Sequence, residues 1–237
     1  GLPGLLSSRS FQGGESPLTI YGPKGIKEFV QTSLEVNGAL PAYPILYQEL
    51  SEGLIEKTDA FQVYAKQLEH GLPSFGFRIV EKDRLGVLQV DKLIQLGIQP
   101  GPIYQRIKEN ETVELDNGQI IHRQDFLGPK KLGRIVTILG DTRYLPGLVE
   151  LVKDSVVLVH EATFASDEEE LAYNYFHSTT KQAAMLAKES NVRRLILTHI
   201  SSRYQKEDVI VLQNQAEAIF PETTIAFDFY ETDIPAK

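Results

Sequence analysis

Polar side chains that can bind metal ions follow four of the strands that the sequence predicts. They are Asp141 after strand 135–139, His160 and Glu161 after strand 156–159, His199 after strand 195–197, and His70 after strand 61–68. Buried strands of α/β proteins present their functional groups at their carboxyl ends, which makes these positions candidates for one shared site. Carboxylate and neutral imidazole are ligands that suit zinc or manganese. The pattern therefore predicts a metal site built from His70, Asp141 and His199.

A structural interpretation of the same residues stays open on spacing alone. A histidine after a strand is more often a hydrogen-bonded surface or core residue than a ligand, and with five histidines in the chain three could reach strand ends by chance. Asp141 is followed by Thr142 and could equally belong to a turn or a helix cap. His122 falls in a predicted hairpin and receives no role. The acidic run 167–170 reads as a solvated face.

The elements that would position these residues alternate between strands and helices, which is typical of the α/β class. Strands are predicted at 18–21, 43–50, 61–68, 75–81, 135–139, 156–159, 195–197 and 224–229. Helices are predicted to begin at Pro23, to cover 88–96 and 181–189, and to cover 208–219. The first helix carries apolar residues, among them Phe29, at spacings of three and four. The third begins with a capping box, in which Thr179 precedes Gln182 by three residues.

Residues 82–132 are predicted to form an excursion that projects from the main body. They lack the long apolar runs of a core. The segment Gln99-Pro100-Gly101-Pro102 reads as a rigid turn outside any regular element. Asp116-Asn117-Gly118 marks a hairpin between residues 112–115 and 119–122.

Composition limits the classes of protein and of site. The chain has 237 residues, which is enough to bury a sizeable core, and no cysteine, which excludes disulfides and thiolate metal sites. No apolar run approaches the roughly 18 residues of a membrane helix, and a cytoplasmic location is expected. The net charge of −8 argues mildly against indiscriminate binding of nucleic acid, so a protein that acts on RNA would need a local basic patch. Candidates for that patch are Lys24, Lys27, Lys92, Arg106, Lys108, Lys130, Lys131 and Arg134.

Four motifs resemble, in content and order, those of the ribonuclease Z family of the metallo-β-lactamase superfamily. They are Leu139-Gly140-Asp141-Thr142-Arg143, Val159-His160-Glu161-Ala162-Thr163-Phe164, His177-Ser178-Thr179-Thr180 and Leu197-Thr198-His199-Ile200-Ser201. Gly-Asp-Thr and Thr-His fit much of the superfamily, whereas the pair His-Glu-Ala-Thr and His-Ser-Thr is specific to the tRNA-processing branch. The opening stretch 1–9 and Tyr21-Gly22-Pro23-Lys24-Gly25 fit that branch as well. The resemblance covers essentially the whole chain.

The resemblance implies a metallo-β-lactamase-type four-layer αβ/βα sandwich of the α/β class. Residues 1–237 would form a single domain of this type, incomplete at its N-terminus, with residues 82–132 as an inserted flexible arm for tRNA binding. The implied activity is that of a zinc-dependent endoribonuclease that removes the 3′ trailer from precursor tRNA, with two zinc ions per subunit in the intact enzyme. A homodimer is also implied, in which each arm reaches towards the partner's site.

The resemblance also assigns roles to individual residues of this sequence. Asp141 would bridge two zinc ions, with His70 completing the first site and His199 the second. Glu161 and His177 would assist proton transfer to the leaving oxygen. The residues implied to bind substrate are Thr163, Ser178 and Thr179 in the acceptor-stem pocket and Gly101 and Pro102 in the arm.

One departure from the family pattern changes what is expected of this chain. The family's His-x-His-x-Asp-His motif, which supplies most ligands of both metals, is expected immediately before Gly1 and does not occur in the sequence. The 237 residues alone are therefore expected to bind zinc weakly and not to cleave RNA. Two alternatives stay open: another phosphodiesterase of the metallo-β-lactamase fold, and a non-catalytic module for tRNA binding or dimerisation.

Overall fold

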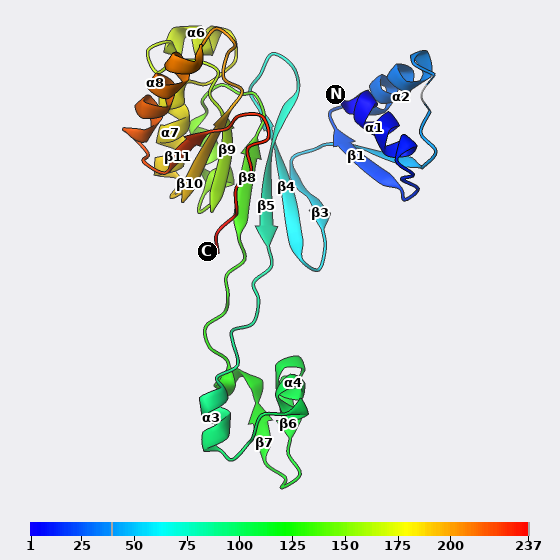
Figure 1. The fold of residues 1–237 in the computed structure, drawn as a ribbon, viewed down its shortest axis with the longest axis vertical. Helices are drawn as coiled ribbons and strands as arrows, with labels where there is room; N and C mark the ends of the chain where they lie inside the picture. Colours follow the sequence, from blue (N-terminus) through cyan, green and yellow to red (C-terminus); the bar gives the residue numbers. More distant parts are fainter. Residues whose placement is uncertain (39, 237) are drawn as a thin grey trace.

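A seven-stranded mixed sheet forms the centre of the protein in the computed structural model, which describes residues 1–38 and 40–236 (Figure 1). Its strands lie in the order β11-β10-β9-β8-β5-β4-β3. Their bounds are β3 (Gly53–Lys57), β4 (Phe61–Leu68), β5 (Ser74–Glu81), β8 (Ile135–Leu139), β9 (Val157–Glu161), β10 (Arg194–Thr198) and β11 (Thr223–Ile225). Strands β8 to β11 pair in parallel, whereas β4 pairs antiparallel with β5, and β5 with β8. The carboxyl ends of β4, β8, β9 and β10 therefore lie at the same end of the sheet, where these strands stop.

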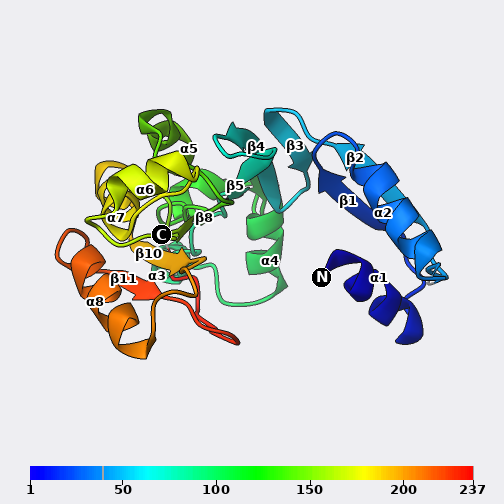
Figure 2. The ribbon, with the colours of Figure 1, turned by 90° about the horizontal axis from the view of Figure 1, so that it is seen from above.

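One face of this sheet is covered by helices α5 (Val149–Val152), α6 (Glu169–Asn174), α7 (Thr180–Glu189) and α8 (Lys206–Glu217) (Figures 1 and 2). The main core lies between the two layers, where Leu158 and Leu195 are fully buried against α7. Helix α7 contributes Ala183 and Ala187, and these small side chains let the helix lie close to the strands. Each buried leucine contributes about 2 kcal/mol to this packing. Within the described residues, no helix is both long and apolar enough to cross a membrane.

The opposite face of the sheet carries a second, smaller apolar cluster. Val157 and Ile196 are buried there and are packed by Ala226 and Tyr230 of the segment after β11. Ile138 of β8 lies on the same face, because it pairs with Val159, and its side chain is 41% exposed. Of the four layers that the resemblance implies, the described residues of this body form one sheet and one helix layer.

A separate lobe is formed by α1 (Leu2–Phe11), β1 (Leu18–Gly22), α2 (Ile26–Val36) and β2 (Ile45–Glu49), and it stands beyond β3 in both ribbon views (Figures 1 and 2). Strands β1 and β2 pair in parallel over a small core. Two details of the prediction are wrong. Helix α2 begins at Ile26 and not at Pro23, because Gly25 takes the left-handed conformation (φ +89°) that starts it. Phe29 is exposed and does not join the buried face.

Residues 81–134 form a long projection from the sheet (Figure 1). We call residues 88–127 the tip and residues 81–87 and 128–134 the stalk. The tip contains α3 (Val90–Gln95), α4 (Pro102–Glu109), β6 (Thr112–Glu114), β7 (Ile120–His122) and a 3-10 helix (Arg123–Phe126). Two predictions for this region are wrong: Pro102 is the first residue of a helix, where its missing N–H costs nothing, and the tip has a core of its own, which includes Leu93 and Ile107.

Most other predicted elements are confirmed. Strands β4, β5 and β8 match their predicted ranges to within one residue, and the predicted hairpin is β6–β7. The capping box is present, since Thr179 Oγ1 accepts from the Gln182 N–H at 3.2 Å and Gln182 Oε1 accepts from the Thr179 N–H at 3.0 Å. Strand β3 was missed because its flanking residues carry turn signals. The closing strand β11 is shorter than the predicted 224–229.

Candidate metal and catalytic site

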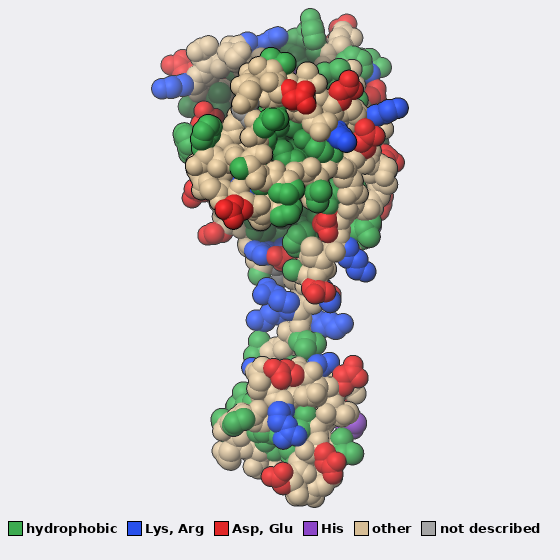
Figure 3. Space-filling view, turned by 90° about the vertical axis from the view of Figure 1, so that its right-hand side faces the viewer, with side chains coloured by type: hydrophobic (Ala, Val, Ile, Leu, Met, Phe, Trp, Pro, Cys, Tyr) green, Lys and Arg blue, Asp and Glu red, His purple; other side chains and the backbone are tan. Residues whose placement is uncertain are grey.

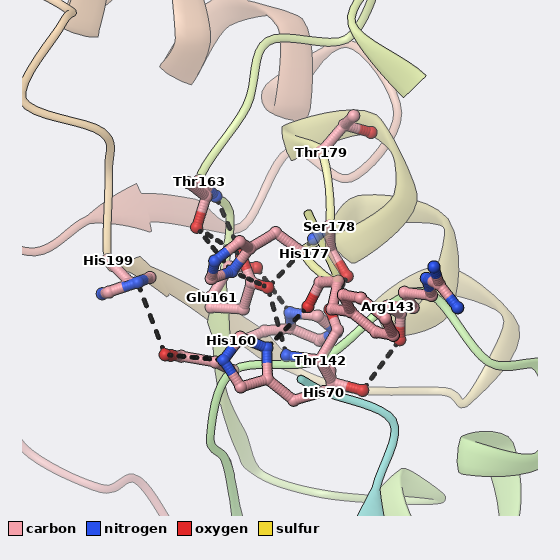
Figure 4. A network of polar contacts seen from close by, with 12 residues as sticks. His70, Thr142, Arg143, His160, Glu161, Thr163, His177, Ser178, Thr179 and His199 are labelled. Carbon is pink, nitrogen blue, oxygen red and sulfur yellow. Dashed lines mark hydrogen bonds and ion pairs between the residues drawn. The ribbon is translucent and has the colours of Figure 1, made fainter. Parts of the chain in front are cut away.

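The residues predicted to bind metal come together at the carboxyl ends of β4, β8 and β10. Asp141 follows β8, His199 follows β10 and His70 follows β4. The Asp141 Oδ2 atom lies 3.5 Å from His199 Nε2 and 4.0 Å from His70 Nε2 (Figure 4). Three segments that are far apart in sequence thus meet, because β4, β8 and β10 all stop at the same end of the sheet.

His177 completes the cluster and lies between the two other imidazoles. Its ring centroid is 5.0 Å from that of His70 and 5.3 Å from that of His199. The potential ligand atoms of Asp141, His177 and His199 all lie within 4.8 Å of one another, so these three residues form a group that could hold a metal ion. A carboxylate with several imidazoles is a donor set that fits zinc.

Backbone geometry fixes the direction of two of these imidazoles. The Nδ1 atom of His70 is 2.9 Å from the Phe176 carbonyl oxygen, which can only accept, so Nδ1 donates and Nε2, on the Asp141 side, is the nitrogen that a metal would take in the neutral imidazole. A donation of this kind to a carbonyl is the usual support of a metal-binding histidine. Both His199 (φ +56°) and Phe176 (φ +61°) hold left-handed backbone that non-glycine residues avoid, and such strain gathers at functional sites.

A buried Glu161–His177 pair lies beside this cluster. The side chain of Glu161 is 1% exposed, and its Oε1 atom is 3.0 Å from His177 Nδ1. It accepts hydrogen bonds from the N–H groups of Thr142, Thr163 and Ser178 and from the Thr163 hydroxyl, at 2.9–3.2 Å. A carboxylate that is held by so many donors fixes the His177 ring, whose Nε2 atom stays available for a ligand or a proton.

Two of the three residues predicted to line the acceptor-stem pocket contact this pair. Thr163 donates to Glu161 and lies 3.2 Å from His177 Nδ1 through its Oγ1 atom. Ser178 donates its hydroxyl to the Thr142 carbonyl at 2.7 Å, and Thr179 is the N-cap of α7. All three are buried. Thr163 and Ser178 therefore contact the Glu161–His177 pair, whereas the Thr179 side chain caps α7.

The two remaining histidines and the residues predicted to bind substrate in the arm do not reach this site. His160 points into the helix layer, where burial lowers its pKa, and its Nδ1 atom is 2.6 Å from the Glu161 carbonyl oxygen. The tip contains His122, Gly101 and Pro102. Its stalk leaves the sheet at the ends of the strands opposite to the site (Figure 1).

Arg143 closes the motif 139–143, but the sequence assigned it no role in this site. Its Nε donates to the Tyr173 carbonyl at 2.6 Å and its NH1 donates to Glu69 Oε1 at 2.7 Å. The guanidinium carbon lies 4.0 Å from the ring centroid of Tyr173 and 3.8 Å from that of Phe176. Arg143 thus ties the loop before His70 and the loop before His177 to the loop of Asp141. Local sequence patterns could not reveal its contacts, because its side-chain partners lie 30 or more residues away.

Comparisons with known proteins identify relatives along nearly the whole chain. The chain is 53% identical over 234 residues to the ribonuclease Z of Bacillus licheniformis, covering 99% of this chain and 76% of the relative. No protein-family model matches the chain.

Two solved structures resemble the fold. The human tRNase Z, short form, superimposes with a TM-score of 0.64 at 27% identity, over 99% of this chain and 74% of that chain. The metallo-beta-lactamase fold protein YhfI from Bacillus subtilis superimposes with a TM-score of 0.58 at 16% identity, over 94% of this chain and 68% of that chain. These matches confirm the predicted fold class.

Proposed function

The chain belongs to the ribonuclease Z family, and from this we propose that it acts as a zinc-dependent endoribonuclease that removes the 3′ trailer from precursor tRNA. The observation that carries the proposal is the meeting of Asp141, His70 and His199 beside a buried Glu161–His177 pair. Metal ligands and a carboxylate-held histidine together suit the hydrolysis of a phosphodiester.

We propose that two zinc ions bind at this cluster. Asp141 would bridge them, His70 would complete one position and His199 the other. The donation from His70 to the Phe176 carbonyl supports this assignment, because it leaves the Nε2 lone pair free for a metal. When bound, the ions supply Lewis-acid activation of water and neutralise charge on the scissile phosphate.

The Glu161–His177 pair would handle the proton of the leaving group. Glu161 holds the Nδ1 side of the ring, so His177 can present a proton on Nε2 to the leaving oxygen as the phosphorus–oxygen bond breaks. The contact between Glu161 and Nδ1 holds the His177 ring in one orientation for this step. Thr163, Ser178 and Thr179 would form the wall against which the acceptor stem lies.

The arm would bind the body of the tRNA for a second subunit. Strand β5 spans eight residues, or about 27 Å. The site lies near the start of this strand, and the stalk leaves from its end. An arm that points away from its own site is suited to serve the site of a partner. We therefore propose a homodimer in which Gly101 and Pro102 of each tip contact the tRNA bound by the partner.

A non-catalytic tRNA-binding module is the second candidate. The observation in its favour is the donor count: besides His177, the site offers Asp141, His70 and His199, fewer donors than two catalytic zinc ions usually take from protein. The two candidate functions predict different results for the same sample after incubation with zinc.

The test combines zinc analysis with cleavage of a 5′-labelled precursor tRNA. The proposal predicts bound zinc and a product with the mature 3′ end, both lost in Asp141→Asn, whereas the sequence alone led us to expect weak zinc binding and no cleavage. His177→Ala should keep zinc and slow cleavage. His122→Ala is the matched histidine control for zinc binding, because His122 lies in the tip.

Three other results would contradict the proposal. Binding of tRNA with neither zinc nor cleavage would favour the non-catalytic module. Cleavage of a small chromogenic phosphodiester without cleavage of tRNA would favour a different substrate. A sample that binds neither zinc nor tRNA would refute both candidates.

A further inference from the structure

Three polar side chains join the two loops that follow β9 and β10. The loop after β9 carries Thr163 and ends at Glu168. The loop after β10 begins with His199 and contains Arg203 and Tyr204. We call Glu168, Arg203 and Tyr204 the Tyr204 cluster. All three lie outside the motifs that carry the family resemblance.

The Tyr204 hydroxyl binds the neighbouring loop as both acceptor and donor. It accepts from the Ala165 N–H at 2.8 Å and donates to Glu168 Oε2. The Tyr204 ring packs against the main core. Burial, together with the hydrogen bond to Glu168, raises the pKa of Tyr204 to about 12. The hydroxyl therefore keeps its proton near neutral pH, as a donor to Glu168 must.

The third member of the cluster adds less to this connection. Arg203 NH1 donates to Glu168 Oε1 at 3.2 Å, and the guanidinium carbon lies 5.1 Å from the ring centroid of Phe164. The Arg203 side chain is 48% exposed and that of Glu168 is 30% exposed. An ion pair with this much access to water contributes little, so the Tyr204 hydroxyl is the main connection between the loops.

The loop after β9 is in direct contact with His177. Thr163 Oγ1 lies 3.2 Å from His177 Nδ1. The buried ring of Phe164 lies 6.1 Å from the imidazole of His177, centroid to centroid, at an interplanar angle of 62°. Because Ala165 follows these two residues in the chain, a displacement of Ala165 would move both contacts. Tyr204 therefore supports His177 without contacting it.

The loop after β10 carries His199 and is joined to the same segment. The Ser201 N–H donates to the Thr163 carbonyl at 3.3 Å, and the Tyr204 N–H donates to the Ser201 carbonyl at 3.1 Å. The rings of His177 and His199 lie 5.3 Å apart, and Figure 4 shows both beside Thr163. The Tyr204 cluster thus joins the loop that supports His177 to the loop that carries a proposed metal ligand.

We propose that Tyr204 and Glu168 are positioning residues of this site: their hydrogen bond holds the loop after β9 against His177 and keeps the imidazole ring in the orientation that Glu161 binds. The consequence for catalysis rests on the proposed function, since a displaced ring would present its proton poorly to the leaving oxygen. The positioning itself is a property of the free protein and can be measured without zinc or RNA.

Hydrogen exchange of the full chain, followed by NMR, tests the positioning. Tyr204→Phe keeps the ring and removes only the hydroxyl, so the Ala165 amide should exchange about tenfold faster, the factor expected for the net loss of one hydrogen bond. The Thr163 amide, which donates to Glu161 Oε2 at 2.9 Å, and the Nδ1 proton of His177 should exchange faster as well. A change that is confined to Ala165 would refute the proposal.

Tyr21→Phe is the matched control. It also removes a tyrosine hydroxyl that binds a glutamate, since Tyr21 donates to Glu56 Oε2 at 2.5 Å. Tyr21 belongs to the lobe of α1, β1, α2 and β2, on the side of the molecule that faces the viewer in Figure 3. Exchange at Thr163 and His177 should not change in this variant. An equal effect of the two substitutions would mean general loosening and would overturn the proposal.

Substitutions of Glu168 test the same bond from its other side. Glu168→Ala should match Tyr204→Phe, and the double variant should exchange no faster than either, because all three lack one interaction. Glu168→Gln keeps an oxygen that can accept from Tyr204 and should fall between Glu168→Ala and the wild type. If Tyr204→Phe does not fold, the two Glu168 variants decide the outcome. Additive effects in the double variant would contradict a shared bond.

Cleavage by the zinc-loaded chain shows whether the positioning serves the reaction. Tyr204→Phe should lower kcat on precursor tRNA about tenfold and leave KM unchanged, because Tyr204 contacts no substrate. A p-nitrophenyl diester, whose leaving group departs without a proton, should be cleaved at nearly the wild-type rate. Equal losses on both substrates would mean that Tyr204 does not act through His177.

The outcomes separate this proposal from the proposed function. If Thr163 and His177 exchange at wild-type rates in Tyr204→Phe, the proposal fails whatever the activity. If exchange rises as predicted and the wild type cleaves no RNA, the proposed function fails and the positioning of His177 stands. If exchange rises but Tyr204→Phe cleaves precursor tRNA as fast as the wild type, the bond supports the loop and not the reaction, which refutes the catalytic role of the positioning.

Discussion

Arg143 offers a demanding test of how the site is held together. Replacing it with methionine keeps an apolar stem and removes the guanidinium that contacts Glu69, Tyr173 and Phe176. The hydrogen bond to the Tyr173 carbonyl is made by a charged donor and contributes about 2 kcal/mol. The pair with Glu69 is half exposed and adds less than about 1 kcal/mol. With the two ring contacts, Arg143→Met should lower the free energy of unfolding by about 3 kcal/mol.

The same substitution should loosen the metal site beyond its effect on stability. Without Arg143, the loops before His70 and His177 lose their shared anchor, and zinc affinity should fall about tenfold or more. Urea denaturation gives the stability, and zinc titration at low denaturant, where the variant is folded, gives the affinity. Arg143→Lys, which keeps the charge but not the fork of donors, should fall between the wild type and Arg143→Met.

Arg78→Met provides the matched control. Arg78 also anchors backbone, since its NH1 donates to the carbonyls of Leu151 and Lys153 at 2.7 Å, but it lies away from the site. It should lower stability without changing zinc affinity. Equal zinc affinities for Arg143→Met and Arg78→Met would refute the reasoning, because Arg143 would then support only the fold.

Three other predictions concern the supports of the site and of the arm. Glu161→Gln should lower the free energy of unfolding by about 3 kcal/mol, measured by urea denaturation, because an amide turns its own N–H groups towards buried donors; an unchanged midpoint would contradict this. The Arg134 guanidinium lowers the pKa of Glu81 from 4.5 to about 2, so the stability that this pair adds is complete above pH 4.5 and is lost as the pH falls towards 2. That loss, about 1 kcal/mol for a partly exposed pair, should be absent from the pH profile of Glu81→Gln. Gly86→Ala should make the stalk more sensitive to proteolysis, because the added Cβ atom would lie 2.0 Å from the Gly128 carbonyl oxygen. In the control Gly147→Ala the added Cβ atom meets no atom within 4 Å, so digestion should not change. Equal digestion of the two variants would contradict the close contact.

The convergence of Asp141, His199 and His70 could be predicted from the sequence because it follows from topology. Apolar runs mark buried strands, and parallel strands stop at the same end of a sheet. The polar residues after them therefore lie close together. The assignment of His177 needed the resemblance, since no strand precedes it. The left-handed backbone of His199, which helps to set the direction of its ring, depends on its surroundings and leaves no mark on the sequence.

The errors have a common physical cause. The core of the tip is built from single apolar residues such as Leu93, Ile98 and Ile107, which come together only through folding and give no long apolar run. Phe29 has helical spacing but faces solvent, because spacing fixes which residues share a face and not which face is buried. The contacts of Arg143 join residues that are far apart in sequence, and local patterns contain no information about them.

Zinc K-edge absorption of the zinc-loaded chain tests the central claim most directly. We expect only nitrogen and oxygen ligands at about 2.0–2.1 Å, with an imidazole contribution that decreases in His199→Ala and in His70→Ala but not in His122→Ala. A spectrum that is the same in all three variants would place the metal elsewhere and contradict the assignment of Asp141, His70 and His199.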